Sequence, residues 1–188
     1  MEGKLTVRAL LLSSLIFTGQ VMAADGTVHF LGEIVDSTCE VTTDTKDQVV
    51  ELGKVNKTSF SGVDSTAAPA SFSIKLEKCP ETYTKAAVRF DGTEVGDGNL
   101  AIGNPLTDVT PGDYTGDAAD PLVATGVGIR IYNRDDNSQV KLFNDSSWSN
   151  IQSGEAELKF IARYIQVADA VTAGTANADS QFTVEYQK

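Results

Sequence analysis

The stretch Gly26-Thr27-Val28-His29-Phe30-Leu31-Gly32-Glu33-Ile34-Val35 alternates like a β-strand, although it stands near the start of the chain. Side chains of an extended strand point alternately to opposite faces, so Val28, Phe30 and Ile34 would project from one face. Gly32 would complete that row without a side chain. An amphipathic strand needs an apolar partner, and the rest of the sequence indicates where that partner is.

The residues before this strand have the features of a secretory signal. A basic start and a short apolar run lead to a small-residue cleavage context at residues 21–23. Cleavage is expected after Ala23, with Ala24 as the alternative. The apolar run is too short to cross a hydrocarbon core of about 30 Å as a helix. We therefore expect residues 1–23 to be removed and the mature chain to be exported.

The chain is strongly acidic, with a formal net charge of −11. Removal of residues 1–23 takes away Glu2, Lys4 and Arg8, which makes the charge one unit more negative. Phosphate backbones and anionic membrane surfaces repel such a chain. Nucleic acid is therefore not expected as a partner, and the acidic residues are interpreted mainly as a solubilising surface.

The two cysteines, Cys39 and Cys79, are expected to form one disulfide bond. They are the only cysteines in a chain that carries an export signal, and they do not form a Cys-x-x-Cys pair. A metal site would need further ligands, and His29 is the only histidine. On the alternation of the segment, His29 lies on the face opposite Val28 and is expected at the surface.

The sequence after the first cysteine is typical of an all-β protein. Residues 92–121 are rich in glycine and proline and are expected to form a loop with local strands at most. No helical periodicity of useful length competes, so one antiparallel β-sandwich is predicted. Runs of strand type occur at residues 48–52, 71–77, 88–91, 127–131, 140–143, 156–164 and 181–187.

Several motifs, in this order, resemble the major subunits of type 1 fimbriae, which the chaperone-usher pathway of Gram-negative bacteria assembles. The resemblance covers nearly the whole chain behind the signal sequence. Its carriers are Gly-Thr-Val-His-Phe-x-Gly-Glu at 26–33, the cysteine pair, Thr-Gly-Val-Gly-Ile at 125–129, Phe-Ile-Ala-Arg-Tyr at 160–164, and Ala-Asn-Ala-Asp at 176–179 leading into Phe-x-Val-x-Tyr at 182–186.

The resemblance implies an incomplete immunoglobulin-like antiparallel β-sandwich that lacks its last strand. A donor strand from another subunit would complete it, which is strand addition used for polymerisation. Residues 24–36 would then be the N-terminal donor extension, and residues 37–188 the pilin domain. The donor side chains would be Val28, Phe30 and Ile34, with Gly32 where two backbones approach closely.

The acceptor groove and the chaperone-recognition motif are carried over onto the end of the chain. The alternating row Phe182, Val184 and Tyr186 and the upstream Gly174 match the family's motif. The expected partners are neighbouring copies of the same chain, other fimbrial subunits, a periplasmic chaperone and an outer-membrane usher. The expected location is a fimbrium on the cell surface, reached through the periplasm.

Two other classes of function compete with that of a structural subunit of an adhesive fimbria. A minor adaptor or tip-proximal subunit with its own receptor-binding site is the alternative. A secreted hydrolase is disfavoured because no Gly-x-Ser-x-Gly elbow occurs and a lone His29 cannot easily form a triad. No catalytic residue, metal ligand or cofactor is therefore predicted.

Overall fold

A computed structural model describes residues 26–32, 38–103 and 122–188. The chain divides into two compact units, residues 1–35 and 36–188. In the first unit, residues 26–32 form neither helix nor strand. The predicted signal segment lies outside the described residues.

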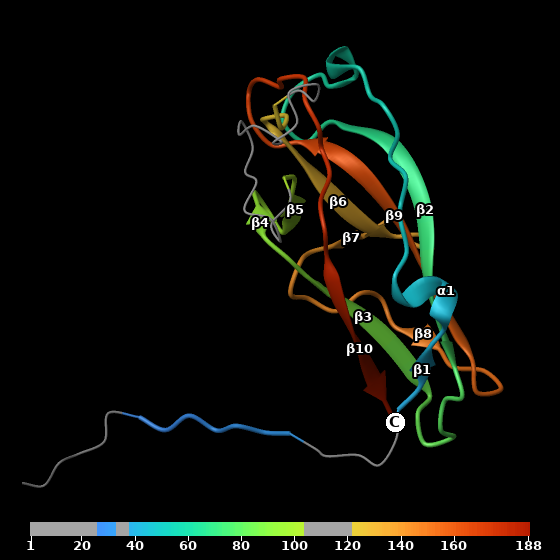
Figure 1. Cartoon of the computed structure of the whole chain (residues 1–188). Coiled ribbons are helices and arrows are strands. Elements are labelled where there is room, and N and C mark those ends of the chain that lie inside the picture. Colours follow the sequence, from blue (N-terminus) through green and yellow to red (C-terminus); the bar gives the residue numbers. More distant parts are fainter. Residues whose placement is uncertain (1–25, 33–37, 104–121) are drawn as a thin grey trace, which may run out of the picture. The chain divides into compact units, whose positions relative to one another are not determined.

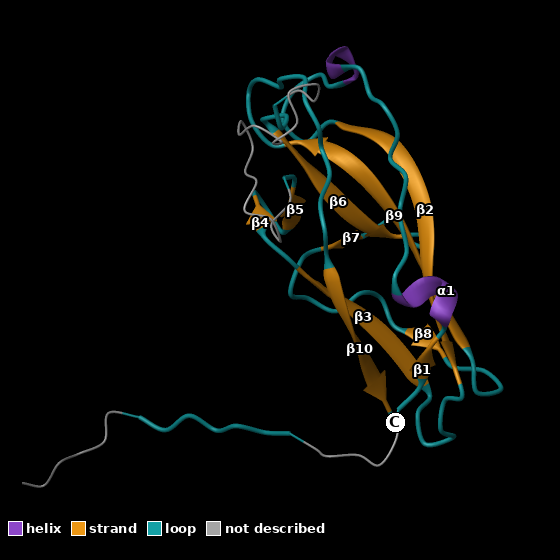
Figure 2. Cartoon of the chain, viewed as in Figure 1, coloured by secondary structure: helices purple, strands orange, loops and turns teal. Residues whose placement is uncertain are grey.

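The second unit is built from antiparallel strands, with two short helical turns (Figures 1 and 2). Its larger sheet has the order β1-β2-β9-β6-β5-β4, with β7 paired to β6, and its smaller sheet has the order β10-β3-β8. The strands of the larger sheet are β1 (Glu40–Val41), β2 (Thr66–Glu77), β4 (Glu94–Val95), β5 (Asn99–Ala101), β6 (Val127–Asn133), β7 (Gln139–Val140) and β9 (Ala156–Gln166). Those of the smaller sheet are β3 (Lys85–Asp91), β8 (Ser149–Asn150) and β10 (Gln181–Gln187), and the helical turns are α1 (Thr43–Lys46) and the 3-10 helix η1 (Lys57–Ser59).

The core lies between the two sheets and follows the period of two in the sequence. Ile74 and Leu76 of β2 and Leu158 of β9 are almost fully buried, whereas the residues between them are exposed or half-buried. The ring of Phe90 on β3 meets the ring of Phe160 on β9 edge to face, with centroids 5.1 Å apart. Apolar alternation on both sheets therefore produces the predicted sandwich.

The strand predictions are confirmed for the long alternating runs and are wrong for two short ones. β2, β3, β6, β9 and β10 occur where alternation predicts them. Of the run 140–143, only Val140 lies in a strand, as the second residue of β7. The chain turns at Phe143, which has a positive φ of 63°. The run 48–52 is not a strand, for a reason that concerns the candidate site.

The predicted disulfide is present and joins Cys39, next to β1, to Cys79, just after β2. It closes a loop with a sequence separation of 40 residues. β1 begins at the residue after Cys39, so the bond ties the start of β1 to the segment just after β2.

We expect replacement of both Cys39 and Cys79 by serine to lower the free energy of unfolding by roughly 4 kcal/mol, because a loop of this length loses that much closure entropy when cross-linked. Urea denaturation of the oxidised protein and the double variant measures the difference. A change below about 1 kcal/mol would contradict a stabilising role for the bond.

Candidate functional site

The last strand, β10, presents its apolar residues to the core from the edge of the smaller sheet. Phe182, Val184 and Tyr186 are half-buried and pack against the core cluster. The ring of Phe182 lies 6.5 Å from that of Phe90, and the ring of Tyr186 lies 5.0 Å from that of Tyr83. The residues predicted as the acceptor row thus share one face, and none of them is fully covered.

β3, the neighbour of β10, has its other edge covered by residues 143–150. The Phe143 N–H donates to the Phe90 carbonyl and the Ser146 N–H donates to the Val88 carbonyl, both at 2.8 Å. The backbone groups of Val88 and Phe90 therefore point away from β10. Since backbone direction alternates along a strand, Ala87 and Arg89 bond with β10 instead.

The pairing register then fixes which backbone groups of β10 are unpaired. Ala87 lies opposite Glu185, and Arg89 lies opposite Thr183. These two residues of β10 bond to β3, so Phe182, Val184 and Tyr186 direct their N–H and C=O groups to the outer edge. Among the described residues, no backbone hydrogen bond reaches these outer groups. The residues whose side chains face the core are thus also the residues whose backbone lacks a partner strand.

Residues 48–55, between α1 and η1, form a second segment without backbone pairing. In Figure 1 this segment is the cyan loop that leads from α1 toward η1. Val50 and Leu52 are half-buried against the same core cluster as β10, while Val49 is 85% exposed. No backbone–backbone hydrogen bond from residues 48–55 reaches another described residue. The Gln48 side chain donates to the Thr45 carbonyl at 3.2 Å and to the Ser73 carbonyl at 3.0 Å. The sequence predicts a strand at 48–52. Exposure does alternate along these residues, but no neighbouring strand pairs with them, so they do not form a strand.

The segment predicted to be the donor exposes its large apolar side chains. Val28 is 75% and Phe30 is 91% exposed, and a Cβ added at Gly32 would meet no atom within 4 Å. Ile34 lies outside the described residues. Water contact of such large side chains is unfavourable by about 1.5 to 3 kcal/mol each compared with burial. Contiguous exposed apolar surface is typical of interaction sites, so this segment stays a candidate donor.

Gly174, predicted as part of the chaperone-recognition motif, lies against residues 122–124. The Ala124 N–H donates to the Thr175 carbonyl at 2.8 Å, and the Thr175 N–H donates to the Leu122 carbonyl at 3.1 Å. A Cβ on Gly174 would overlap the Leu122 carbonyl oxygen and the Ala124 amide nitrogen. This glycine thus permits a close approach of two backbones.

We expect Gly174→Ala to lower the free energy of unfolding by about 1 to 3 kcal/mol, because the added methyl group must push two backbones apart. Thermal denaturation measures the loss. Gly26→Ala is the matched control, since a Cβ at Gly26 meets nothing within 4 Å. Equal stability of the two variants would contradict the close packing at Gly174.

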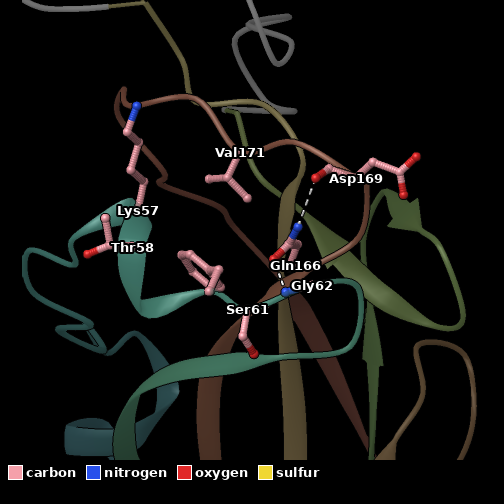
Figure 3. Close-up of a pocket in the computed structure, with 8 residues that line it drawn as sticks. Lys57, Thr58, Ser61, Gly62, Gln166, Asp169 and Val171 are labelled. Atoms are coloured by element: carbon pink, nitrogen blue, oxygen red, sulfur yellow. Dashed lines mark hydrogen bonds between the residues drawn. The ribbon is translucent and has the colours of Figure 1, made fainter.

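A pocket of about 390 Å³ lies near the 3-10 helix η1. Figure 3 shows Gln166 between its two walls: its side-chain oxygen accepts from the Gly62 N–H at 3.0 Å, and its amide donates to the Asp169 carbonyl at 3.4 Å. Phe60 and Val171, two apolar lining residues, pack against the core cluster that also holds β10. The pocket is therefore contiguous with the core and lacks a nucleophile paired with a base.

The half-buried phenols of Tyr164 and Tyr186 have pKa values above that of a free tyrosine. Burial raises the pKa of the Tyr186 phenol above its ordinary value; a hydrogen bond from Thr38 opposes the shift and Tyr83 adds to it. Burial also raises the pKa of Tyr164. Since the folded pKa lies above the unfolded value, neutral phenol stabilises the fold below about pH 10, and this contribution is lost as the pH rises through the folded pKa.

We therefore expect an ultraviolet absorbance titration to contain a late-ionising fraction that decreases in the variant Tyr186→Phe. Unfolding in urea should shift that fraction to lower pH. A titration curve whose late portion is unchanged in Tyr186→Phe would contradict the burial of this phenol.

Three further features of the described part of the chain concern metal binding, the exposure of His29 and membrane spanning. No group of three or more histidine, cysteine or acidic residues that could hold a metal ion occurs there. His29 is exposed, as predicted. No helix within the described ranges is long and apolar enough to cross a membrane.

The fold and the open edge define a class of protein: an incomplete immunoglobulin-like β-sandwich of the pilin type. Solved structures share this fold. The P pilus rod subunit PapA aligns with a TM-score of 0.57 at 20% identity, over 80% of this chain and all of that one. A chain in the structure of a chaperone-usher pilus aligns with a TM-score of 0.56 at 21% identity, over 93% of this chain and all of that one.

Sequence comparison gives the family. The profile of the family described as "Fimbrial protein" matches residues 28–187. The "Type-1 fimbrial protein subunit" of Serratia marcescens is 40% identical over 97% of both chains, and the "Fimbrial subunit type 1" of Klebsiella pneumoniae is 35% identical over 97% of this chain and 98% of that one. The chain belongs to the fimbrial protein family and is a structural subunit of a fimbria.

The sequence did not indicate two parts of this site. The first is the flank at residues 48–55, where the run 48–52 predicts a strand and the structure has none. The second is the cover that residues 143–150 place on β3, which leaves β10 as the open edge of the smaller sheet. Only the pairing of distant segments reveals either part.

Proposed function

We propose that the chain is the repeating subunit of an adhesive fimbria and that it polymerises head to tail by donor-strand exchange. Residues 24–36 of one copy act as the donor strand. They occupy the acceptor of the next copy, formed by the outer edge of β10 and the unpaired residues 48–55. The observation that carries the proposal is the unpaired backbone of Phe182, Val184 and Tyr186 beside their half-buried side chains.

The donor and the acceptor are complementary: the acceptor has unpaired backbone groups, and the donor has exposed apolar side chains. The outer edge of β10 offers N–H and C=O groups that a strand can bond at about 0.5 to 1.5 kcal/mol net for each hydrogen bond. The donor offers Val28, Phe30 and Ile34, each worth about 1.5 to 3 kcal/mol when buried. Gly32 of the donor occupies the point in the acceptor where a side chain would keep the backbones of donor and acceptor apart.

The pocket beside η1 belongs to the acceptor in this proposal. Phe60 and Val171 line it and pack on the same core cluster as Phe182. An inserted strand that covers the half-buried residues of β10 would therefore meet this pocket at one end. It supplies additional apolar surface for a donor side chain.

The open edge supports a proposed route to the cell surface in which another strand covers it before assembly. An open apolar edge associates indiscriminately unless another strand covers it. A periplasmic chaperone lends a strand to this edge after residues 1–23 have been removed, and an outer-membrane usher is the site where the donor segment of the next subunit replaces it. Residues 24–36 are then the donor extension, and residues 37–188 the pilin domain, of a fimbrium on the cell surface that serves attachment.

Negative-stain microscopy of cells that express the chain with its assembly partners tests this function. A specific antibody should label the whole shaft of the fimbriae. Labelling restricted to fimbrial tips would contradict a repeating subunit and would indicate the minor adaptor instead.

A further inference from the structure

The larger sheet also has an edge with unpaired backbone, on β2. One side of β2 pairs with β9 along most of its length. On the other side, β1 pairs only with Leu76 and Glu77, and the Thr42 N–H donates to the Lys75 carbonyl at 3.0 Å. From Thr66 to Phe72, no backbone hydrogen bond from a described residue reaches this outer side.

The direction of the backbone groups on β2 follows from β9. The Arg134 N–H donates to the Lys159 carbonyl, so the odd-numbered residues of β9 point their backbone away from β2. Phe160 and the other even-numbered residues bond with β2. Phe72 lies opposite Phe160, so the alternate residue Ser71, which is exposed, turns its backbone outward. This second edge could therefore also accept a strand.

A bulge interrupts this edge. Ala67 pairs with Tyr164 and Ala70 pairs with Ala162, so two residues of β2, Ala68 and Pro69, stand opposite a single residue of β9. Ala68 has a φ of 54°, which lies in the left-handed region that an alanine rarely adopts. The residue before a proline is further biased against helical conformations. Pro69 is exposed and has no N–H to offer.

β10 carries none of these features. Its register with β3 continues without a shift from Gln181 opposite Asp91 to Gln187 opposite Lys85. The strand contains neither proline nor glycine. Bulges and prolines are the means by which proteins protect sheet edges from strand addition, and here they occur on one open edge and not on the other.

We propose that the Ala68-Pro69 bulge prevents the donor segment of a second copy from adding at β2, so that each subunit accepts one donor strand, at β10. The proposal rests on the proposed function, because it concerns the same donor segment. Its consequence is a polymer without branches. The strained conformation of Ala68 is maintained because it breaks the flatness of an edge that would otherwise compete with β10.

The experiment uses a protein whose β10 edge is already occupied, made by appending a copy of residues 24–36 after Lys188 through a flexible linker. The native N-terminal donor stays in place. In this background, deletion of Ala68 together with Pro69→Thr restores a regular strand. Pro69→Thr alone restores the N–H but keeps the bulge, and Pro80→Ser is the matched control, since Pro80 lies outside the strands.

Analytical ultracentrifugation should show that the parent protein and Pro80→Ser are monomers, whereas the double change loses its monomer peak to larger species and Pro69→Thr shows a smaller loss. If circular dichroism shows that the double variant is folded and it remains a monomer, the proposal is overturned. If the double variant does not fold, deletion of Ala68 alone decides, because it removes the extra residue of the bulge and keeps Pro69. A folded deletion variant that is a monomer at all concentrations overturns the proposal. A parent protein that is not a monomer would instead argue against the proposed function.

Discussion

Deletion of residues 24–36 should abolish fibre formation while leaving the sandwich folded. The donor strand is lost, but the core between β2, β3 and β9 does not depend on it. Circular dichroism of the purified variant should match that of the full chain, and the variant should still bind the periplasmic chaperone of the proposed function. Electron microscopy measures the loss of fibres.

Single substitutions distinguish the contributions of the two faces of the donor segment to polymerisation. Phe30→Ser removes a side chain that the proposal buries in the neighbour, whereas His29→Ser changes the opposite face. We expect Phe30→Ser to reduce polymerisation strongly and His29→Ser to leave it nearly unchanged. Undiminished polymerisation after the deletion, or equal effects of the two substitutions, would contradict the assignment of the donor.

A copy of residues 24–36 appended after Lys188 through a flexible linker should give a monomer of unusual thermal stability. The appended strand can pair with the outer edge of β10 in the same molecule and cover Phe182, Val184 and Tyr186. Burial of its apolar side chains at about 1.5 to 3 kcal/mol each should exceed the cost of ordering the linker. For a domain of this size, the melting temperature should rise by about 10 °C or more.

The control for this extended protein carries Gly32→Phe in the appended copy only. A phenyl group should not fit where two backbones approach closely, so the gain in melting temperature should disappear. Equal melting temperatures for the chain with and without the appended strand would contradict an acceptor at β10. A full gain with Gly32→Phe would contradict the role of the glycine.

The sequence predicts long strands well because their two faces differ. In β2, Phe72, Ile74 and Leu76 alternate with polar residues, and a strand with one buried face requires that pattern. The same reasoning places β9 and β10. It also identifies the row Phe182, Val184 and Tyr186 as core-facing, since the side-chain pattern alone determines that property.

What the sequence does not predict is which backbone groups find a partner. The run 48–52 alternates as a strand should, yet it lacks a neighbour, and no local pattern reveals this. The cover that residues 143–150 provide for β3 likewise depends on contacts between distant segments. The Ala68-Pro69 bulge is visible in sequence only as a proline, and its position on an open edge emerges only from the register with β9.

Hydrogen exchange at individual amides of β10 tests donor-strand exchange most directly, because the backbone directions make opposite predictions for neighbouring residues. In the isolated subunit, the amides of Thr183 and Glu185 should be protected by β3, while those of Phe182, Val184 and Tyr186 should exchange rapidly. In assembled fibres, all five should be protected. Rapid exchange of Phe182, Val184 and Tyr186 in the fibre, at the rate of the isolated subunit, would contradict a donor strand at this edge.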